Sequence, residues 1–306
     1  MKKGLLLPYI ALVSICLIWG TTYLALRIAV THFPPFLFVV IRQIIAGLIL
    51  GGGVMLVRKT SLPSWREIRR QAIAGFFMIS LGNGLVAWAE VEIPSGIAAI
   101  ICSLMPVMVI LINLTINKDE KPTVPILLGV AMGLAGIVMI FGENISEFAN
   151  PTYLLSIIMV FVGVISWAGG SIWLKKDKTT SDPFLNAGIQ MFFGGVWLIP
   201  FSLFFDDLET VRWTPEAAYA LVYLIILGSV VAYACYTFVL RKLPMTIVSL
   251  YAYVNPLVAV FLGWLILDEQ LNLNTVIAFA LTVAGIYVVN RGYQLRDAWR
   301  AQLSDR

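Results

Sequence analysis

Apolar segments of membrane-spanning length follow one another along almost the entire chain. A helix needs about 20 predominantly apolar residues to cross the hydrocarbon core of a bilayer. The segments near that length are joined by short links, none of which could hold a soluble domain. They lie at residues 8–28, 36–57, 72–91, 97–117, 124–141, 153–173, 184–204, 217–239, 246–267 and 274–290. We therefore predict an all-α integral membrane protein with ten transmembrane helices.

The composition of the chain supports this class. Of the 306 residues, 60% are hydrophobic and 12% are charged, whereas soluble domains carry about 25% charged residues. Lys2 and Lys3 precede the first apolar segment and resemble the start of a signal peptide. That segment is longer than a typical signal-peptide core and no small-residue cleavage site comes after it, so we predict a retained first helix.

The basic residues predict the orientation of the chain. If the N-terminus is cytoplasmic, all but three of the 21 lysines and arginines fall in cytoplasmic segments. The exceptions are Arg27 and Arg212, in predicted outer segments, and Arg42, inside the second helix. Because cytoplasmic loops are enriched in lysine and arginine, we predict that both termini are cytoplasmic.

The two halves of the chain repeat each other. Trp19 matches Trp167 at an offset of 148, Glu120 matches Glu269 at 149, and one internal proline matches another at 150. The first repeat is predicted at 1–145 and the second at 150–292, followed by a basic cytoplasmic tail at 293–306. Each half holds five predicted helices, and an odd number inverts the second half relative to the first. Two inverted halves are typical of alternating-access transporters, whose substrate site lies between them.

Two apolar segments carry a proline in their middle. Pro106 lies in the first half and Pro256 at the matching place in the second. A proline frees the carbonyl four residues earlier and can bend a helix, so both are candidate hinges, and a static kink is the alternative. We expect Glu120 and Glu269, at the ends of these segments, to be structural.

Arg42 is the most informative single residue. A charge inside the membrane is costly unless it is paired or hydrated, and Glu90 lies at a similar predicted depth. We expect the two to face each other or a shared aqueous cavity. Arg42 would then bind a substrate carboxylate, with Glu90 as its resting partner or as a proton-coupling acid. A structural ion pair, or an arginine extended toward the interface, is the alternative. The position matching Arg42 in the second half is Gln190, which is polar but uncharged.

Aromatic and amide side chains complete the set of candidate substrate-binding residues. Trp19, Tyr23 and Trp167 would form cavity walls for an apolar or aromatic group, or would pack helices together. Asn83 shares a helical face with Glu90, because the two are seven residues apart, and it would either bind substrate or form a hydrogen bond between helices. The remaining candidates are Trp88, Tyr253 and Asn255.

The chain resembles a known family in an ordered set of short motifs. These are 18–23 (IWGTTY), Arg42, 82–84 (GNG) with 89–90 (AE), 94–99 (PSGIAA) and 249–256 (SLYAYVNP). Over residues 8 to 291 the sequence resembles the EamA family of the drug/metabolite transporter superfamily, and most closely its YedA-like members. The resemblance implies an inner (cytoplasmic) membrane carrier that exports amino acids or related metabolites, driven by exchange of protons or other ions.

We therefore predict a secondary transporter of small organic metabolites, embedded in the lipid bilayer, and not an enzyme. The sequence has no phosphate-binding glycine loop, no His/Cys cluster and no nucleophile elbow, so we predict no cofactor, no metal and no nucleic-acid partner. The alternative is an integral membrane enzyme or flippase acting on lipid-linked substrates. That activity needs clustered catalytic acids, histidines or basic phosphate-binding residues at one membrane face, and the sequence lacks such a cluster.

Overall fold

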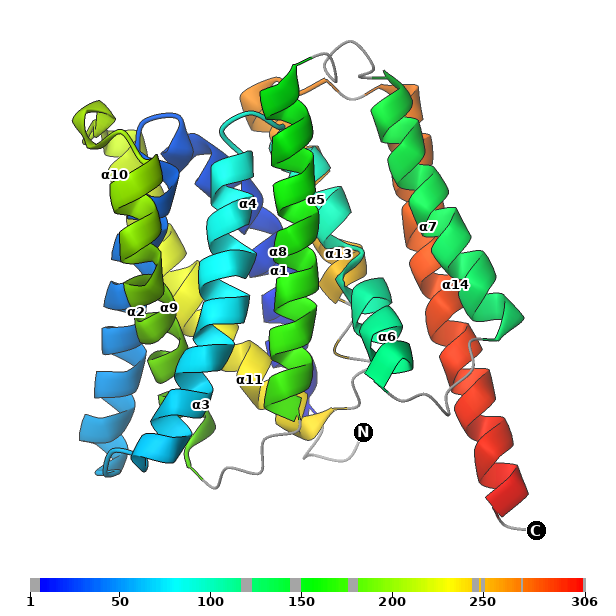
Figure 1. Ribbon diagram of the computed structural model, residues 1–306, viewed down its shortest axis with the longest axis horizontal. Coiled ribbons are helices and arrows are strands. Elements are labelled where there is room, and N and C mark those ends of the chain that lie inside the picture. The colour runs from blue at the N-terminus through cyan, green and yellow to red at the C-terminus, as the bar shows by residue number, and fades with distance from the viewer. Residues whose placement is uncertain are drawn as a thin grey trace.

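The computed structural model describes residues 6–116, 123–143, 150–175, 181–243, 248, 251–270 and 272–304, and within these ranges it contains helices and no strand. The helices form a bundle with a separate pair at one edge (Figure 1). They are α1 (Leu6–Val30), α2 (Pro35–Arg58), α3 (Trp65–Gly75), η1 (Phe76–Asn83), α4 (Gly84–Ala89), α5 (Ser95–Cys102), α6 (Met105–Ile116), α7 (Val124–Glu143), α8 (Pro151–Lys175), α9 (Pro183–Phe205), η3 (Leu208–Thr210), α10 (Pro215–Tyr223), η4 (Leu224–Val231), α11 (Ala232–Lys242), α13 (Tyr251–Leu267) and α14 (Leu273–Ser304).

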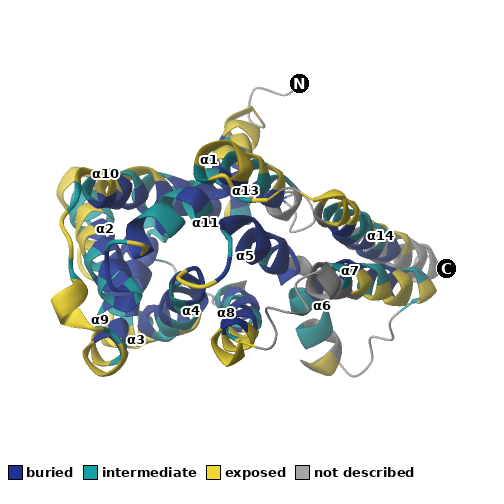
Figure 2. Cartoon of the chain, turned by 90° about the horizontal axis from the view of Figure 1, so that it is seen from above, coloured by how far each residue is buried: buried dark blue, intermediate teal, exposed yellow. Residues whose placement is uncertain are grey.

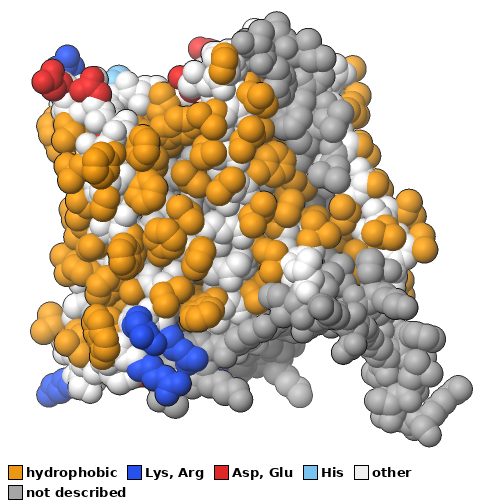
Figure 3. Space-filling view, viewed as in Figure 1, with side chains coloured by type: hydrophobic (Ala, Val, Ile, Leu, Met, Phe, Trp, Pro, Cys, Tyr) orange, Lys and Arg blue, Asp and Glu red, His pale blue; other side chains and the backbone are white. Residues whose placement is uncertain are grey.

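The helices have the lengths and surfaces of a multi-pass membrane protein. Among the described residues, six helical stretches are long and apolar enough to span a bilayer: α1, α2, the continuous run from α3 to α4, α8, α9, and the run from α10 to α11. Four shorter apolar helices lie at Ser95–Val109, Val124–Gly133, Val254–Leu267 and Val276–Val289. Apolar side chains cover the visible face between an upper edge with acidic residues and a lower edge with basic ones (Figure 3). Buried residues face the interior of the bundle (Figure 2).

Helix boundaries differ from the sequence prediction at three places. The third helix begins at Trp65 rather than near residue 72, because Ser64 and Glu67 form a capping box around its polar first turns. The fourth segment is broken between α5 and α6, directly before Pro106. The last helix continues to Ser304, through the predicted tail.

Two π-helical segments interrupt long helical runs in the described part of the chain. η1 (Phe76–Asn83) joins α3 to α4, and η4 (Leu224–Val231) joins α10 to α11. Each has eight residues, and their first residues are 148 positions apart, as are Trp19 and Trp167. π-helices are rare and occur frequently at functional sites.

Helices α2 and α9 pack through glycines in an antiparallel pair. A Cβ at Gly47 would lie 2.5 Å from the backbone nitrogen of Phe192 and 2.7 Å from the carbonyl oxygen of Gly188. A Cβ at Gly195 would likewise lie 3.0 Å from the backbone nitrogen of Ile44. Small residues allow this close approach of membrane helices, so α2 and α9 form one rigid unit.

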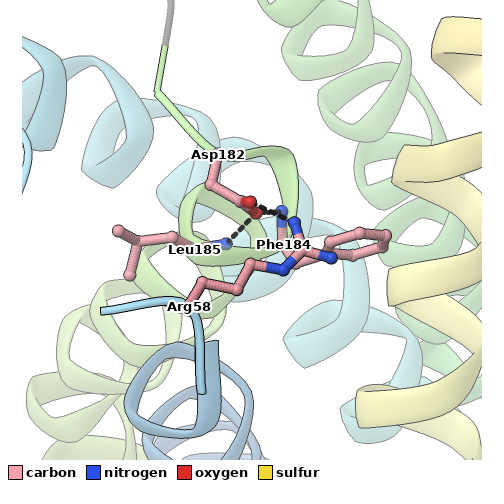
Figure 4. A network of polar contacts seen from close by, with 4 residues as sticks. All are labelled: Arg58, Asp182, Phe184 and Leu185. Atoms are coloured by element: carbon pink, nitrogen blue, oxygen red, sulfur yellow. Dashed lines mark hydrogen bonds and ion pairs between the residues drawn. The ribbon is translucent and has the colours of Figure 1, made fainter. Parts of the chain in front are cut away.

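Acidic side chains fasten both ends of this pair. At one end Asp182 accepts hydrogen bonds from the backbone N–H groups of Phe184 (2.8 Å) and Leu185 (3.3 Å) and pairs with Arg58 of α2 (Figure 4). At the other end Asp206 accepts from the N–H groups of Phe36 (3.3 Å) and Leu37 (2.7 Å). Burial raises the pKa of the Asp206 carboxyl above its usual value, although these N–H groups oppose the shift.

Helices α7 and α14 form the second close pair. A Cβ at Gly129 would lie 2.5 Å from the carbonyl oxygen of Gly285. The two helices lie side by side at one edge of the bundle (Figures 1 and 2). This pair therefore packs chiefly within itself, while the site lies in the main bundle.

Candidate functional site

A cavity of about 110 Å³ lies inside the main bundle. Helices from both halves of the chain line it. The lining residues are Trp19, Thr22, Tyr23, Leu26, Arg42, Gly82, Asn83, Val86, Cys102, Met105, Gly163, Val164, Trp167, Tyr251 and Asn255. Of the predicted candidates, the structure brings together Trp19, Tyr23, Arg42, Asn83, Trp167 and Asn255.

One face of α1 forms a wall of this cavity. Trp19, Thr22, Tyr23 and Leu26 recur at three- and four-residue intervals, which places them on the same side of a helix. The indole N–H of Trp19 donates to the backbone carbonyl of Gly228 in η4, at 3.1 Å. That bond fixes the ring against the opposite half of the chain.

Arg42 lies buried at the cavity, with 5% of its surface exposed. Its Nε donates to the hydroxyl of Ser229, also in η4, at 2.9 Å. A Cβ at the neighbouring Gly228 would lie 3.3 Å from Arg42 Nη2. The π-helical turn therefore supplies both the hydroxyl and the space that position the guanidinium. Among the described residues, no acid forms an ion pair with Arg42.

Aromatic rings pack around Trp19. Its ring centroid lies 6.0 Å from that of Trp167 at an interplanar angle of 89°, and 5.2 Å from that of Tyr251 at 77°. Tyr236, which is fully buried, lies 5.1 Å from Trp19 and does not itself line the cavity. Such edge-to-face clusters make a rigid apolar wall.

Asn255 joins α13 to α1 at the cavity. With the amide oriented to satisfy its surroundings, the nitrogen donates to the backbone carbonyls of Tyr251 (2.9 Å) and Cys16 (3.1 Å). Both amide hydrogens are then used. The side-chain oxygen remains as the hydrogen-bond acceptor of this residue.

Three candidates whose side chains are described do not line the cavity. Trp88 packs against the hydrophobic core. Gln190 is buried in a network in which it donates to Gln71 at 2.6 Å and accepts from the Tyr233 hydroxyl. The side chain of Tyr253 lies outside the described part of the structure, as do that of Pro106 and all of Glu120. Pro256 lies inside α13.

Glu90, the third candidate that does not line the cavity, comes directly after α4 and is completely buried. Neither carboxylate oxygen has a hydrogen-bond partner among the described residues. Arg27 donates to its backbone carbonyl, so a guanidinium lies next to Glu90. No ion pair joins Glu90 and Arg42 among the described residues.

Sequence reasoning did not select several cavity residues. Thr22 and Leu26 could have been found from the helical spacing that starts at Trp19. Tyr251 lies one turn before Asn255. Ser229 had no signal beyond being a polar residue within an apolar segment, since only the π-helical turn directs it at Arg42. Across the described residues, no group of three or more His, Cys, Asp or Glu side chains could hold a metal ion.

Comparison with known proteins gives a consistent result. The sequence profile of the EamA-like transporter family matches residues 6–142 and, a second time, residues 154–291. The "Uncharacterized inner membrane transporter YedA" of Escherichia coli K12 is 33% identical over 306 residues, covering 97% of this chain and 95% of that protein. The "Uncharacterized transporter YoaV" of Bacillus subtilis is 25% identical and covers 91% and 95%. A solved structure titled "Crystal structure of protein" shares the fold, with a TM-score of 0.67, 19% identity and coverage of 92% and 96%.

Proposed function

Because the chain belongs to the EamA-like transporter family, we propose that this membrane transporter is a secondary carrier that exports amino acids or related small metabolites by alternating access. The family and its named relatives support membrane transport. The substrate class comes from the chemistry of the central cavity.

The observation that carries the proposal is Arg42 at the wall of the buried cavity. A guanidinium within the membrane is costly unless it is paired, and here its contact is the neutral hydroxyl of Ser229. A carboxylate bound in the cavity would pair with the Arg42 guanidinium through charge-assisted hydrogen bonds. The rings of Trp19, Trp167 and Tyr251 offer an apolar wall, and the oxygen of Asn255 offers an acceptor for an amino group.

We propose that the fold consists of ten transmembrane helices in two inverted repeats, over residues 1–145 and 150–292. The family profile matches the chain twice, and η1 and η4 begin 148 residues apart. Matching helices also pack together: α2 with α9, α7 with α14, and Trp19 of α1 with Trp167 of α8. These pairings are those expected of a pseudo-twofold axis lying in the membrane plane. In this proposal the basic edge of Figure 3, and both termini, face the cytoplasm.

Glu90 is the group we assign to proton coupling. Burying an isolated ionised carboxylate costs much more than burying its neutral acid, and neither oxygen of Glu90 has a partner among the described residues. Arg27 and Arg42 favour its ionised form, whereas the carboxylate of Glu269 opposes it. Movement of Arg27 or of a bound substrate would therefore change how firmly Glu90 holds a proton. The break before α6 and the proline within α13 are the proposed hinges.

Counterflow in proteoliposomes tests this function. Purified protein is reconstituted with an internal pool of each unlabelled amino acid or nucleoside, and entry of the labelled compound is measured with and without a pH gradient. We expect counterflow of at least one amino acid. Arg42→Ala should reduce it by about 10- to 100-fold, since hydrogen bonds to charged groups contribute about 1.5–3 kcal/mol each.

Arg58→Ala is the matched control, because Arg58 lies at the end of α2 and pairs with Asp182 outside the cavity. Unchanged counterflow in Arg42→Ala would rule out the carboxylate-binding role. Counterflow of nucleosides and of no amino acid would overturn the substrate class.

A further inference from the structure

The carboxylate of Glu269, just beyond α13, is bound at the start of α5. Its Oε1 accepts from the backbone N–H of Ser95 (2.9 Å) and from the Ser95 hydroxyl (2.8 Å), and its Oε2 accepts from the N–H of Gly96 (3.3 Å). Hydrogen bonds to a carboxylate are stronger than neutral ones. The positive end of the helix dipole adds to them. One side chain thus joins α13, in the second half of the chain, to α5 in the first.

The backbone around Glu269 is shaped for this contact. Asp268 has a positive φ of 53°, which is unusual for a residue other than glycine and is costly unless the surroundings hold it. The N–H of Glu269 donates to the carbonyl of Gly263 at 3.2 Å. A Cβ at Gly263 would collide with the Glu269 carboxylate and would lie 3.0 Å from the Ser95 hydroxyl. The end of α13 therefore leaves room for the carboxylate by having no side chain at residue 263.

This contact lies beside a second cavity. That cavity measures about 380 Å³ and is lined by Arg27, Ile28, Thr31, His32, Pro94, Leu267 and Glu269. Helix α1 lines both cavities, with Leu26 at the central one and Arg27 at the second. Arg27 also donates to the backbone carbonyl of Glu90. The two cavities therefore succeed one another along α1, separated at the level of Leu26, Arg27 and Glu90.

We propose that Glu269 is the gating residue at the outer end of the transport path. Its contact with Ser95 and Gly96 holds α5 against α13. The contact thereby keeps the second cavity, which lies at the outer end, separate from the central cavity. The proposal rests on the transport function above and adds how access to that site is regulated. The contact is reversible, because it consists of hydrogen bonds between helices of different halves, and water can replace each of them when the helix ends part.

Cys102 lines the central cavity and provides a reporter that needs no substrate. In a variant with Cys16→Ala and Cys235→Ala, Cys102 is the only thiol in the chain. Intact cells are treated with a membrane-impermeant thiol reagent, and the rate of Cys102 labelling from the outside is measured. We expect Glu269→Ala to raise this rate about tenfold or more, because several hydrogen bonds to a charged group are lost. Glu269→Gln, which keeps an acceptor, should give an intermediate rate.

Glu209→Ala is the matched control, since Glu209 is an exposed acid in η3. It should label at the parent rate. Equal labelling of Glu269→Ala and the parent, with both proteins monodisperse, would overturn the gate. If labelling responds while no compound shows counterflow, the gate stands and the substrate proposal fails. If a compound shows counterflow while labelling does not respond to Glu269→Ala, the transport function stands and the gate proposal fails.

A disulfide that joins α5 to α13 in place of the Glu269 hydrogen bonds provides a second test. The 3.0 Å between a Cβ at residue 263 and the Ser95 hydroxyl suits a disulfide between cysteines at the two positions. With the three native cysteines replaced by alanine, oxidation of Ser95→Cys/Gly263→Cys/Glu269→Ala should abolish the counterflow that the same protein shows when reduced. Equal counterflow before and after confirmed cross-linking would show that α5 and α13 do not part during transport.

Discussion

Arg42 and Glu90 are both buried but lie in different surroundings. Arg42 has a hydroxyl partner and borders the central cavity, whereas Glu90 is fully buried and its carboxylate has no partner among the described residues. A permanent ion pair would satisfy both charges and leave neither available. Their separation suits a division of labour in which Arg42 binds substrate and Glu90 binds a proton.

Glu90→Gln tests this division. An amide of the same shape cannot take up or release a proton, so accumulation driven by a pH gradient should be lost. Exchange at equal pH on both sides needs no net proton movement and should remain within about twofold, since the substitution leaves the cavity lining unchanged. Glu92→Gln, two residues away and exposed, is the control. Accumulation by Glu90→Gln at the wild-type level would exclude Glu90 as the coupling group.

Single site residues were predictable from the sequence where a charged or aromatic side chain falls deep inside an apolar segment. Arg42, Trp19 and Trp167 stand out because a charge or an indole far inside an apolar segment needs an explanation. Ser229 does not stand out, because one serine within LIILGSVV has no periodic signal. Its contact with Arg42 depends on a π-helical turn, which adds a residue to the turn and rotates the side chains beyond it around the helix axis.

At the scale of elements, the apolar segments were predictable and their irregularities were not. Length and hydropathy locate α1, α2, α8 and α9 within a few residues. The start of α3 was placed too late because its first turns are polar and amphipathic. Pro106 indicated a kink next to the interruption between α5 and α6, but a full break of the helix needs tertiary contacts, which local sequence does not reveal.

The glycine contact of α2 with α9 gives a prediction at this scale. Gly47→Ala should destabilise the purified protein by about 1–3 kcal/mol, because the new methyl group would meet the backbone of Phe192 and Gly188. Gly52→Ala, in the same helix, meets nothing within 4 Å and should be neutral or stabilising by up to about 1 kcal/mol. Thermal unfolding in detergent measures the difference. Equal melting temperatures would show that the two helices do not depend on this contact.

At the scale of the whole molecule, the proposed repeat relates the two halves of the chain, and the sequence indicates it because tryptophan and proline match at nearly constant offsets. The sequence also paired Glu120 with Glu269 but gave no reason for the pair. The structure supplies a reason for one member, since Glu269 binds the start of α5. Contacts between repeats depend on how the halves dock, and periodicity within each half carries no information on that docking.

If the two halves exchange roles during transport, Glu120 should serve the inner end as Glu269 serves the outer one. Glu120 and its expected partners, residues 245–246, lie outside the described residues, so this prediction comes from the repeat alone. In the Cys102 reporter, Glu120→Ala should raise labelling in inside-out vesicles about tenfold, as for loss of bonds to a charged group, and leave labelling of intact cells unchanged. Glu269→Ala should raise labelling of intact cells and leave labelling in inside-out vesicles unchanged. Because alternating access forbids both ends being open together, Glu120→Ala/Glu269→Ala should not label faster from either side than the corresponding single variant. Faster labelling of the double variant from both sides would mean that the inner and outer gates open independently of each other, which contradicts alternating access.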